Sequence, residues 1–173
     1  MKKSIILFDQ QVYRMQNYGG VSRYFSHLIY ELERSKDFKV LPTSYFSENL
    51  HLASLHLESF GILKRLGKFK GHGRIKNFLK QREDRKLLNY IKKGKYDVFH
   101  PTYYQHDFLK YLPPNMPLII TVYDMIHELY LDPILKTIHR ETILKSILIP
   151  RADHIIAISK NTKQDIIGLY PDI

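Results

Sequence analysis

Asp124 and His127 stand three positions apart in the stretch DMIH, directly after the apolar run PLIITVY of residues 117–123. A single helical turn there would place both side chains on one face, where a carboxylate can orient an imidazole for proton transfer. Asp124 has a second interpretation as the cap of a helix, since aspartate is a preferred N-cap residue. The spacing therefore predicts a catalytic pair of Asp124 and His127 and leaves the cap as its alternative.

Two adjacent glycines, Gly19 and Gly20, stand directly before a pattern of helical spacing. Because glycine lacks a Cβ, the pair predicts a sharp turn with unusual backbone angles and with amide groups close to a ligand. The start of the helix adds N–H groups and a positive dipole end, which favour an anion such as phosphate. A plain tight turn is the alternative. Arg23, in the first helical turn, either adds positive charge for the anion or is a solvated surface residue.

Two further polar residues end predicted strands: His100 ends DVFH and Ser159 ends HIIAIS. Both are candidates for substrate binding, but His100 can equally close the sheet, and Ser159 is favoured as the N-cap of the following helix. The sequence has neither a D-x-D motif nor a cluster of His and carboxylate residues, so no metal site is predicted. It also lacks the GxGxxG spacing of nicotinamide and flavin enzymes, and we expect no cofactor.

Apolar runs alternate with segments of helical spacing along the chain. Short, nearly continuous apolar runs are typical of parallel strands that are covered on both faces. The alternation indicates an α/β fold, a Rossmann-like doubly wound parallel sheet with helices on both faces, in which ligands bind beyond the carboxyl ends of the strands. The predicted strands are 4–8, 38–46, 96–100, 117–124 and 154–159, and the predicted helices are 21–34, 74–93, about 134–149 and 160–170.

A length of 173 residues suffices for one substantial core, so residues 1–173 are predicted to form a single domain. The chain carries 27 Lys and Arg against 17 Asp and Glu, and the net charge of +10 indicates an anionic partner.

The chain has no cysteine, which excludes disulfides and thiolate metal sites. The opening MKKSIILF is too short for a signal peptide core, and no run approaches the ~20 apolar residues that span a bilayer. We therefore expect a cytoplasmic protein.

The basic excess is concentrated in residues 64–95, which hold 13 Lys or Arg and two acids, Glu83 and Asp84. A solvated face is the simplest interpretation of such a run. Because apolar residues such as Phe69 and Phe78 stand among the charges, the segment also resembles an amphipathic element that rests on an anionic membrane, here the inner face of the cell membrane. Nucleic acid is the least favoured partner, since no recognised binding motif accompanies the charge.

Four blocks, YGGVSRYF, YDVFHPTYY, PLIITVYDMIHELY and RADHIIAISKNTKQDII, resemble in their order the N-terminal half of a family 4 glycosyltransferase of the GT-B architecture. The resemblance covers almost the whole chain. It implies a two-domain enzyme that transfers a sugar, of the hexosyltransferase type, from a nucleotide-sugar donor to an acceptor with retention of configuration and without an obligatory metal. It also implies that Gly19 and Gly20 line the cleft between the two domains.

In such enzymes the N-terminal domain chiefly holds the acceptor, and the C-terminal domain binds most of the nucleotide. That second domain is absent from residues 1–173, so we expect this fragment to be inactive alone. Many relatives place a histidine directly before the aspartate, where this chain has Tyr123. The role of that histidine, which touches the donor sugar, cannot be transferred to Tyr123. Either His127 takes this role in the present chain, or no residue does. Tyr123 itself stays a candidate for substrate binding.

The sequence is thus interpreted as the acceptor-binding half of a retaining glycosyltransferase, with cell-surface polysaccharide synthesis as the expected process. A sugar or a lipid-linked sugar is the expected acceptor. The alternative, from another functional class, is a non-catalytic basic module that binds nucleic acid or phosphorylated ligands.

Overall fold

The computed structural model describes residues 2–42, 47–57, 72–130 and 139–173 of the chain. Its strands are β1 (Ser4–Phe8), β2 (Phe38–Leu41), β3 (Val98–His100), β4 (Ile119–Val122) and β5 (His154–Ala157). All of the described strand pairs are parallel, in the ladders β2-β1-β3 and β4-β5. A parallel bridge between Phe99 and Leu118 joins β3 to β4, so the spatial order is β2-β1-β3-β4-β5. This order confirms the predicted parallel sheet.

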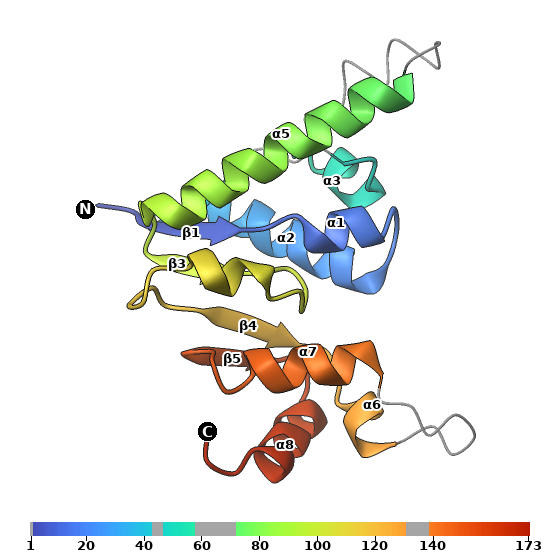
Figure 1. The fold of residues 1–173 in the computed structure, drawn as a ribbon, viewed down its shortest axis with the longest axis vertical. Coiled ribbons are helices and arrows are strands. Elements are labelled where there is room, and N and C mark those ends of the chain that lie inside the picture. The colour runs from blue at the N-terminus through green and yellow to red at the C-terminus, as the bar shows by residue number, and fades with distance from the viewer. Residues whose placement is uncertain (1, 43–46, 58–71, 131–138) are drawn as a thin grey trace.

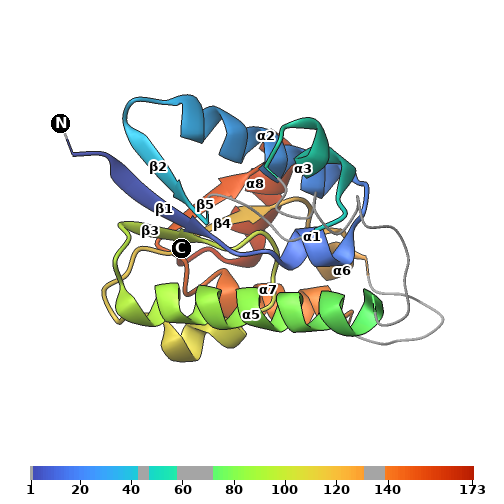
Figure 2. The same cartoon turned by 90° about the horizontal axis from the view of Figure 1, so that it is seen from above.

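Helices cover both faces of this sheet, as predicted. Figure 2 shows α2 and α8 on one side of the strands and α5 and α7 on the other. The described helices are α1 (Gln11–Met15), α2 (Gly20–Arg34), α3 (Leu50–Ser54), α5 (His72–Lys93), the 3-10 helix η1 (Asp107–Tyr111), α6 (Ile126–Leu129), α7 (Arg140–Leu148) and α8 (Lys160–Leu169).

The two faces of the sheet have separate cores because successive side chains of a strand point to opposite sides. In β1, Leu7 belongs to the core that contains Ile91 of α5 and Leu148 of α7. Its neighbour Phe8 belongs to the core that contains Phe25 of α2. Both faces of β1 are therefore buried, which explains why its sequence is a nearly continuous apolar run.

Several element bounds differ from the prediction. The predicted strand 38–46 ends at Leu41, before Pro42, whose ring nitrogen cannot donate to a ladder, and residues 43–46 lie outside the described residues. The predicted helix 134–149 is α7 from Arg140, and residues 134–138 lie outside the described residues as well. The short helices α1, α3, α6 and η1 were not predicted, because four or five residues are too few to display a helical period.

Among the described residues, no helix combines the length and the apolar character that crossing a bilayer requires.

Candidate functional site

The carboxyl ends of the parallel strands meet at one edge of the sheet. In Figure 1 this edge faces right, where α1, the beginning of α2 and α6 lie. The chain leaves β1 toward β2 on one side and continues from β3 toward β4 on the other, so β1 and β3 flank the point at which the strand order reverses. Ligands of doubly wound sheets bind at such a point.

Asp9, directly after β1, connects the loops at this point. Its carboxylate is 3% exposed and accepts hydrogen bonds from the backbone N (2.9 Å) and Oγ1 (2.6 Å) of Thr102, which follows β3. It also accepts from the backbone N of Gln11 at 3.2 Å and from its Nε2 at 2.5 Å. Burial raises the pKa of Asp9, and these hydrogen bonds oppose the rise. Sequence analysis missed Asp9, although its place at a strand end was the available signal.

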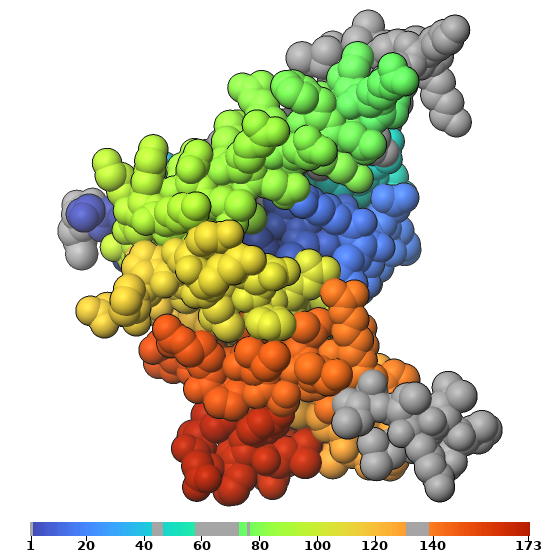
Figure 3. All heavy atoms as spheres, viewed as in Figure 1, coloured from blue at the N-terminus to red at the C-terminus, as the bar shows by residue number. Residues whose placement is uncertain are grey.

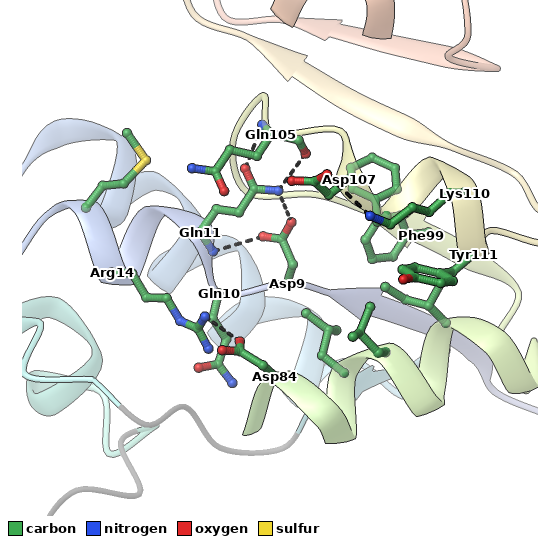
Figure 4. Close-up of a pocket in the computed structure, with 15 residues that line it drawn as sticks. Asp9, Gln10, Gln11, Arg14, Asp84, Phe99, Gln105, Asp107, Lys110 and Tyr111 are labelled. Carbon is green, nitrogen blue, oxygen red and sulfur yellow. Dashed lines mark hydrogen bonds and ion pairs between the residues drawn. The ribbon is translucent and has the colours of Figure 1, made fainter. Parts of the chain in front are cut away.

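A pocket of about 440 Å³ lies beside Asp9, between α1, α5 and η1. Figure 4 shows Gln11 at its centre, where the side chain bonds to Asp9 and exchanges two hydrogen bonds of 2.8 and 2.9 Å with the backbone of Gln105. Arg14 and Asp84 form an ion pair across the neighbouring wall. Apolar lining comes from residues that include Ile91, Phe99 and Phe108. This mixture of amide, charged and apolar groups suits a polar organic ligand with one apolar face.

The glycine pair does not adopt the unusual backbone angles that were predicted. Gly19 is extended, with φ of 169° and ψ of 164°, and Gly20 is the first residue of α2. The predicted backbone angles were therefore wrong. A Cβ on Gly19 would overlap the end of the Gln16 side chain, which would have to move. Gln16 Oε1 accepts a hydrogen bond from Ser22 N at 3.3 Å at the start of α2. At Gly20 a Cβ would meet no atom within 4 Å.

An open groove of about 560 Å³ runs along α2 from Gly20. Arg23 is exposed and lines it together with His27 and Glu31. Tyr24 also lines this groove, and its ring meets the ring of Tyr123 edge-on, with centroids 6.5 Å apart. The structure therefore brings three of the predicted residues, Gly20, Arg23 and Tyr123, into one neighbourhood.

Tyr123, after β4, is held by hydrogen bonds at both its backbone and its ring. Its hydroxyl donates to the carbonyl oxygen of Thr102 at 3.3 Å, and its backbone N donates to the hydroxyl of Tyr104 at 3.2 Å. Burial raises the pKa of Tyr123, and the neighbouring hydroxyl of Tyr104 adds to the rise, so the phenol stays protonated. Tyr123 therefore serves as a neutral hydrogen-bond donor that ties the loop after β4 to the loop after β3.

His100 lies in the core, not on the surface of the edge. It is 4% exposed, and its ring centroid lies 5.2 Å from that of Phe8 and 5.3 Å from that of Phe25. Its Nε2 is 3.0 Å from Oγ1 of Thr121, and burial lowers its pKa to about 4. A neutral, buried imidazole of this kind favours the structural alternative for His100 over contact with a substrate.

Ser159 is the N-cap of α8. Its Oγ accepts a hydrogen bond from Thr162 N at 3.0 Å, which satisfies an N–H that has no partner inside the helix. Thr162 Oγ1 in turn donates to the carbonyl oxygen of Tyr123 at 3.3 Å. The cap interpretation of Ser159 is thus confirmed, and the cap also connects the loops after β4 and β5. A role in substrate binding stays a prediction.

Asp124 and His127 do not form the predicted hydrogen-bonded pair in the part of the chain that the structure describes. Asp124 Oδ1 accepts from the backbone N of Ile126 at 3.2 Å and lies 3.9 Å from Lys145 Nζ. The N-cap position of α6 is held by Met125, so the helix-cap alternative for Asp124 is wrong by one position. The ring of His127, on α6, stacks on that of His139, with centroids 4.1 Å apart. Nothing here tests whether either residue is catalytic, so that role stays a prediction.

Lys145 fixes α6 and the preceding loop to α7. Although it is a lysine, it is 1% exposed, and its Nζ donates to Glu128 Oε2 at 2.8 Å and to the carbonyl oxygen of Asp124 at 2.9 Å. The side chain of Glu128 is buried as well. A buried ammonium group requires such partners, because the cost of removing a charge from water is otherwise not offset. Sequence analysis missed this pair, whose members stand 17 positions apart.

Comparison with known proteins identifies the family. The model of the family described as Glycosyltransferase Family 4 matches residues 18–172 of the chain. No curated protein and no solved structure matches the chain.

Removal of the imidazole at position 100 tests its burial in the neutral form. The pKa of His100 is about 4 in the folded state and near 6.5 in the unfolded state, so the unfolded state binds more protons between these values. Stability is lost as the pH falls from about 6.5 to about 4, by roughly 3 kcal/mol in total. Urea unfolding at a series of pH values should therefore show a shallower acid loss for His100→Gln than for the natural chain. The exposed His154→Gln serves as a control, and parallel pH profiles for all three proteins would contradict the assignment.

The buried ion pair of Lys145 and Glu128 is testable by a double-mutant cycle. Lys145→Met leaves Glu128 buried without its cation and should cost about 3–5 kcal/mol in the free energy of urea unfolding. The double variant Lys145→Met/Glu128→Leu should recover most of that loss, because two apolar groups need no charge partner. The more exposed pair of Lys86 and Glu83 gives the matched control, with an expected change below about 1 kcal/mol. A similarly small cost for Lys145→Met alone would show that the pair is not desolvated.

Proposed function

Because this chain belongs to glycosyltransferase family 4, we propose that it forms the acceptor-binding half of an enzyme that transfers a sugar from a nucleotide-sugar donor with retention of configuration. The observation that carries the proposal is the extent of the family match. It begins at Tyr18, directly before the glycine pair, and ends beyond α8. It therefore includes the loops after β3, β4 and β5 that form the carboxyl edge of the sheet.

The groove at the beginning of α2 is suited to the phosphate side of such a reaction. It opens at Gly20, where no side chain fills the space, and it carries the exposed guanidinium of Arg23. The positive end of α2 points to the same place. Transfer of a sugar from a nucleotide leaves a diphosphate, and preorganised positive groups and amide dipoles stabilise the charge that develops on it. In this proposal Gly20 keeps the space open and Arg23 supplies charge.

The pocket beside Asp9 is suited to the acceptor. The N–H groups of Gln11 and Gln105 are used within the protein, but the side-chain oxygen of Gln11 and the carbonyl oxygen of Gln105 can each accept one further hydrogen bond. The partly exposed side chains of Leu87 and Tyr111 present apolar surface. Sugars combine hydroxyl groups with apolar ring faces, so a lining of this kind fits them. The donor nucleotide and the sugar are proposed to be held mainly by a second domain, which closes over the same edge.

We further propose that the enzyme acts in the cytoplasm at the inner face of the membrane, on a lipid-linked acceptor of cell-surface polysaccharide synthesis. Support comes from α5, which forms a ridge along one border of the molecule in Figure 3. The ridge exposes basic side chains, among them Arg82 and Arg85, and the apolar side chain of Phe78, which is 61% exposed. The acids of this helix are partly neutralised, since Asp84 pairs with Arg14 and Glu83 with Lys86. An anionic membrane attracts such a surface.

The substitution Gly20→Val in the full-length enzyme tests the role of the groove. The added side chain enters open space, so thermal stability should change little, while sugar transfer should fall by about 10-fold or more because the ligand loses that space. Transfer is measured from a panel of labelled UDP- and GDP-hexoses to acceptors in a membrane extract. Gly168→Val is the matched control, since a Cβ there also meets no atom within 4 Å but lies in the last turn of α8. Equal transfer by both variants would remove Gly20 from the site, and a folded full-length protein that transfers no sugar would count against the proposed reaction.

Sedimentation with vesicles tests the membrane surface. The natural chain should bind anionic vesicles at low salt, bind neutral ones weakly, and lose the difference as salt screens the charges, over ~8 Å at physiological ionic strength. The triple variant Arg74→Glu/Arg82→Glu/Arg85→Glu should abolish binding. The control Arg151→Glu/Lys160→Glu/Lys163→Glu makes the same change of charge at exposed positions outside α5 and should retain it. Equal loss in both variants would show that only net charge matters.

A further inference from the structure

Three side chains with metal-binding atoms converge where α6 meets α7. His127 lies on α6, His139 is the N-cap residue of α7, and Glu141 stands in the first turn of α7. One ligand atom of each residue lies within 4.8 Å of those of the other two, and all three side chains are half-buried. The two imidazole rings stack at an angle of 23°. The sequence spacing did not predict this group, because residues 131–138 separate its members along the chain.

These three side chains are also unengaged in the described part of the molecule. None of them makes a hydrogen bond or an ion pair to another described residue. The neighbouring acids differ in this respect, since Lys145 binds Glu128 at 2.8 Å and lies 3.9 Å from Asp124. The nearby buried cation is thus committed to Glu128 and Asp124, and the carboxylate of Glu141 is left available. Among the described residues, the two imidazoles and the carboxylate thus face one another as a set of potential metal ligands.

We propose that His127, His139 and Glu141 bind a first-row divalent transition-metal ion, for which Zn²⁺ is the probe. Two imidazoles and one carboxylate are a ligand set that Zn²⁺ accepts in open sites, with water in the remaining position. Mg²⁺ and Ca²⁺ prefer oxygen ligands and are disfavoured by the two imidazoles. Ligands bound at about 2.0–2.2 Å to a tetrahedral ion lie about 3.3 Å apart, so side-chain rotations must bring the three groups closer than they stand.

The backbone on which these ligands stand is already held in place. Lys145, in the same helix as Glu141, reaches across to Glu128, the neighbour of His127, and to the carbonyl oxygen of Asp124. Its burial and its hydrogen bonds fix α6 against α7 whether or not an ion is present. Metal binding therefore needs to order only side chains, which lowers its cost relative to a site that must assemble its backbone.

This inference goes beyond the proposed sugar transfer and does not depend on it. It also differs from the predicted pair of Asp124 and His127, because His139 and Glu141 take no part in that pair. A bound ion would join α6 to the beginning of α7 and would stabilise the folded state in proportion to its occupancy. Variants of His139 and Glu141 therefore test the metal site while His127 is kept.

The test is a titration of the purified protein, without a histidine tag, with Zn²⁺ in competition with a chromophoric chelator. We expect one tightly bound ion per chain, a rise in melting temperature on its addition, and two imidazole ligands by X-ray absorption spectroscopy. His139→Asn and Glu141→Gln should each weaken Zn²⁺ binding by at least roughly 10–100-fold, the loss that follows when even an outer-shell partner of a metal site is removed. His154→Asn and Glu31→Gln change the same residue types at exposed positions outside the cluster and should bind as the natural chain does.

Circular dichroism of the metal-free proteins establishes that each variant is folded, and Glu141→Gln is nearly isosteric, so a loss of binding there is a loss of a ligand. Absence of stoichiometric Zn²⁺ binding to the natural chain would overturn the proposal. So would an affinity of both cluster variants equal to that of the two controls.

Discussion

The arrangement of the carboxyl edge depends on one buried carboxylate. Asp9 accepts hydrogen bonds from Thr102, 93 positions away, and from Gln11, which itself bonds to Gln105. A buried charge is tolerated only where such donors surround it, so the loops after β1 and β3 must keep this geometry. The pocket beside Asp9 and the hydroxyl of Tyr123, which donates to Thr102, lie around the same junction. One carboxylate thus fixes the loops that line this pocket.

The sequence predicted most of the sheet and the longer helices, because burial on both faces leaves a strong local pattern. β1 is nearly all apolar since Leu7 and Phe8 enter different cores, and α2 shows its period through residues such as Phe25 and Ile29. Contacts between distant segments leave no such pattern. Asp9 with Thr102, Lys145 with Glu128, and His127 with His139 became visible only when the fold brought them together. Patterns that repeat within a few residues can be predicted, and pairings across the fold cannot.

The predictions made for single residues show the same difference between local patterns and contacts across the fold. Ser159 caps α8, as its local sequence indicated, and His100 is a core residue whose partners, Thr121 and Phe8, come from other strands. For the glycine pair the predicted unusual backbone angles were wrong, because Gly19 is extended and Gly20 begins the helix. A Cβ on Gly19 would meet only the end of the flexible Gln16 side chain, and the part of the pair in binding stays a prediction. Spacing locates residues at strand ends, but the packing around them decides their role.

The contact of Gln16 with the beginning of α2 means that the proposed diphosphate would have to compete with a side chain for that helix end. The amide oxygen of Gln16 occupies the N–H of Ser22 at 3.3 Å, a long hydrogen bond to a neutral acceptor. An incoming neutral group, such as a sugar hydroxyl or a water molecule, would exchange one neutral acceptor for another and gain little. A phosphate oxygen forms a hydrogen bond about twice as strong and also meets the positive end of the helix. In the proposed reaction, displacement of the Gln16 amide would therefore favour the diphosphate over any neutral group.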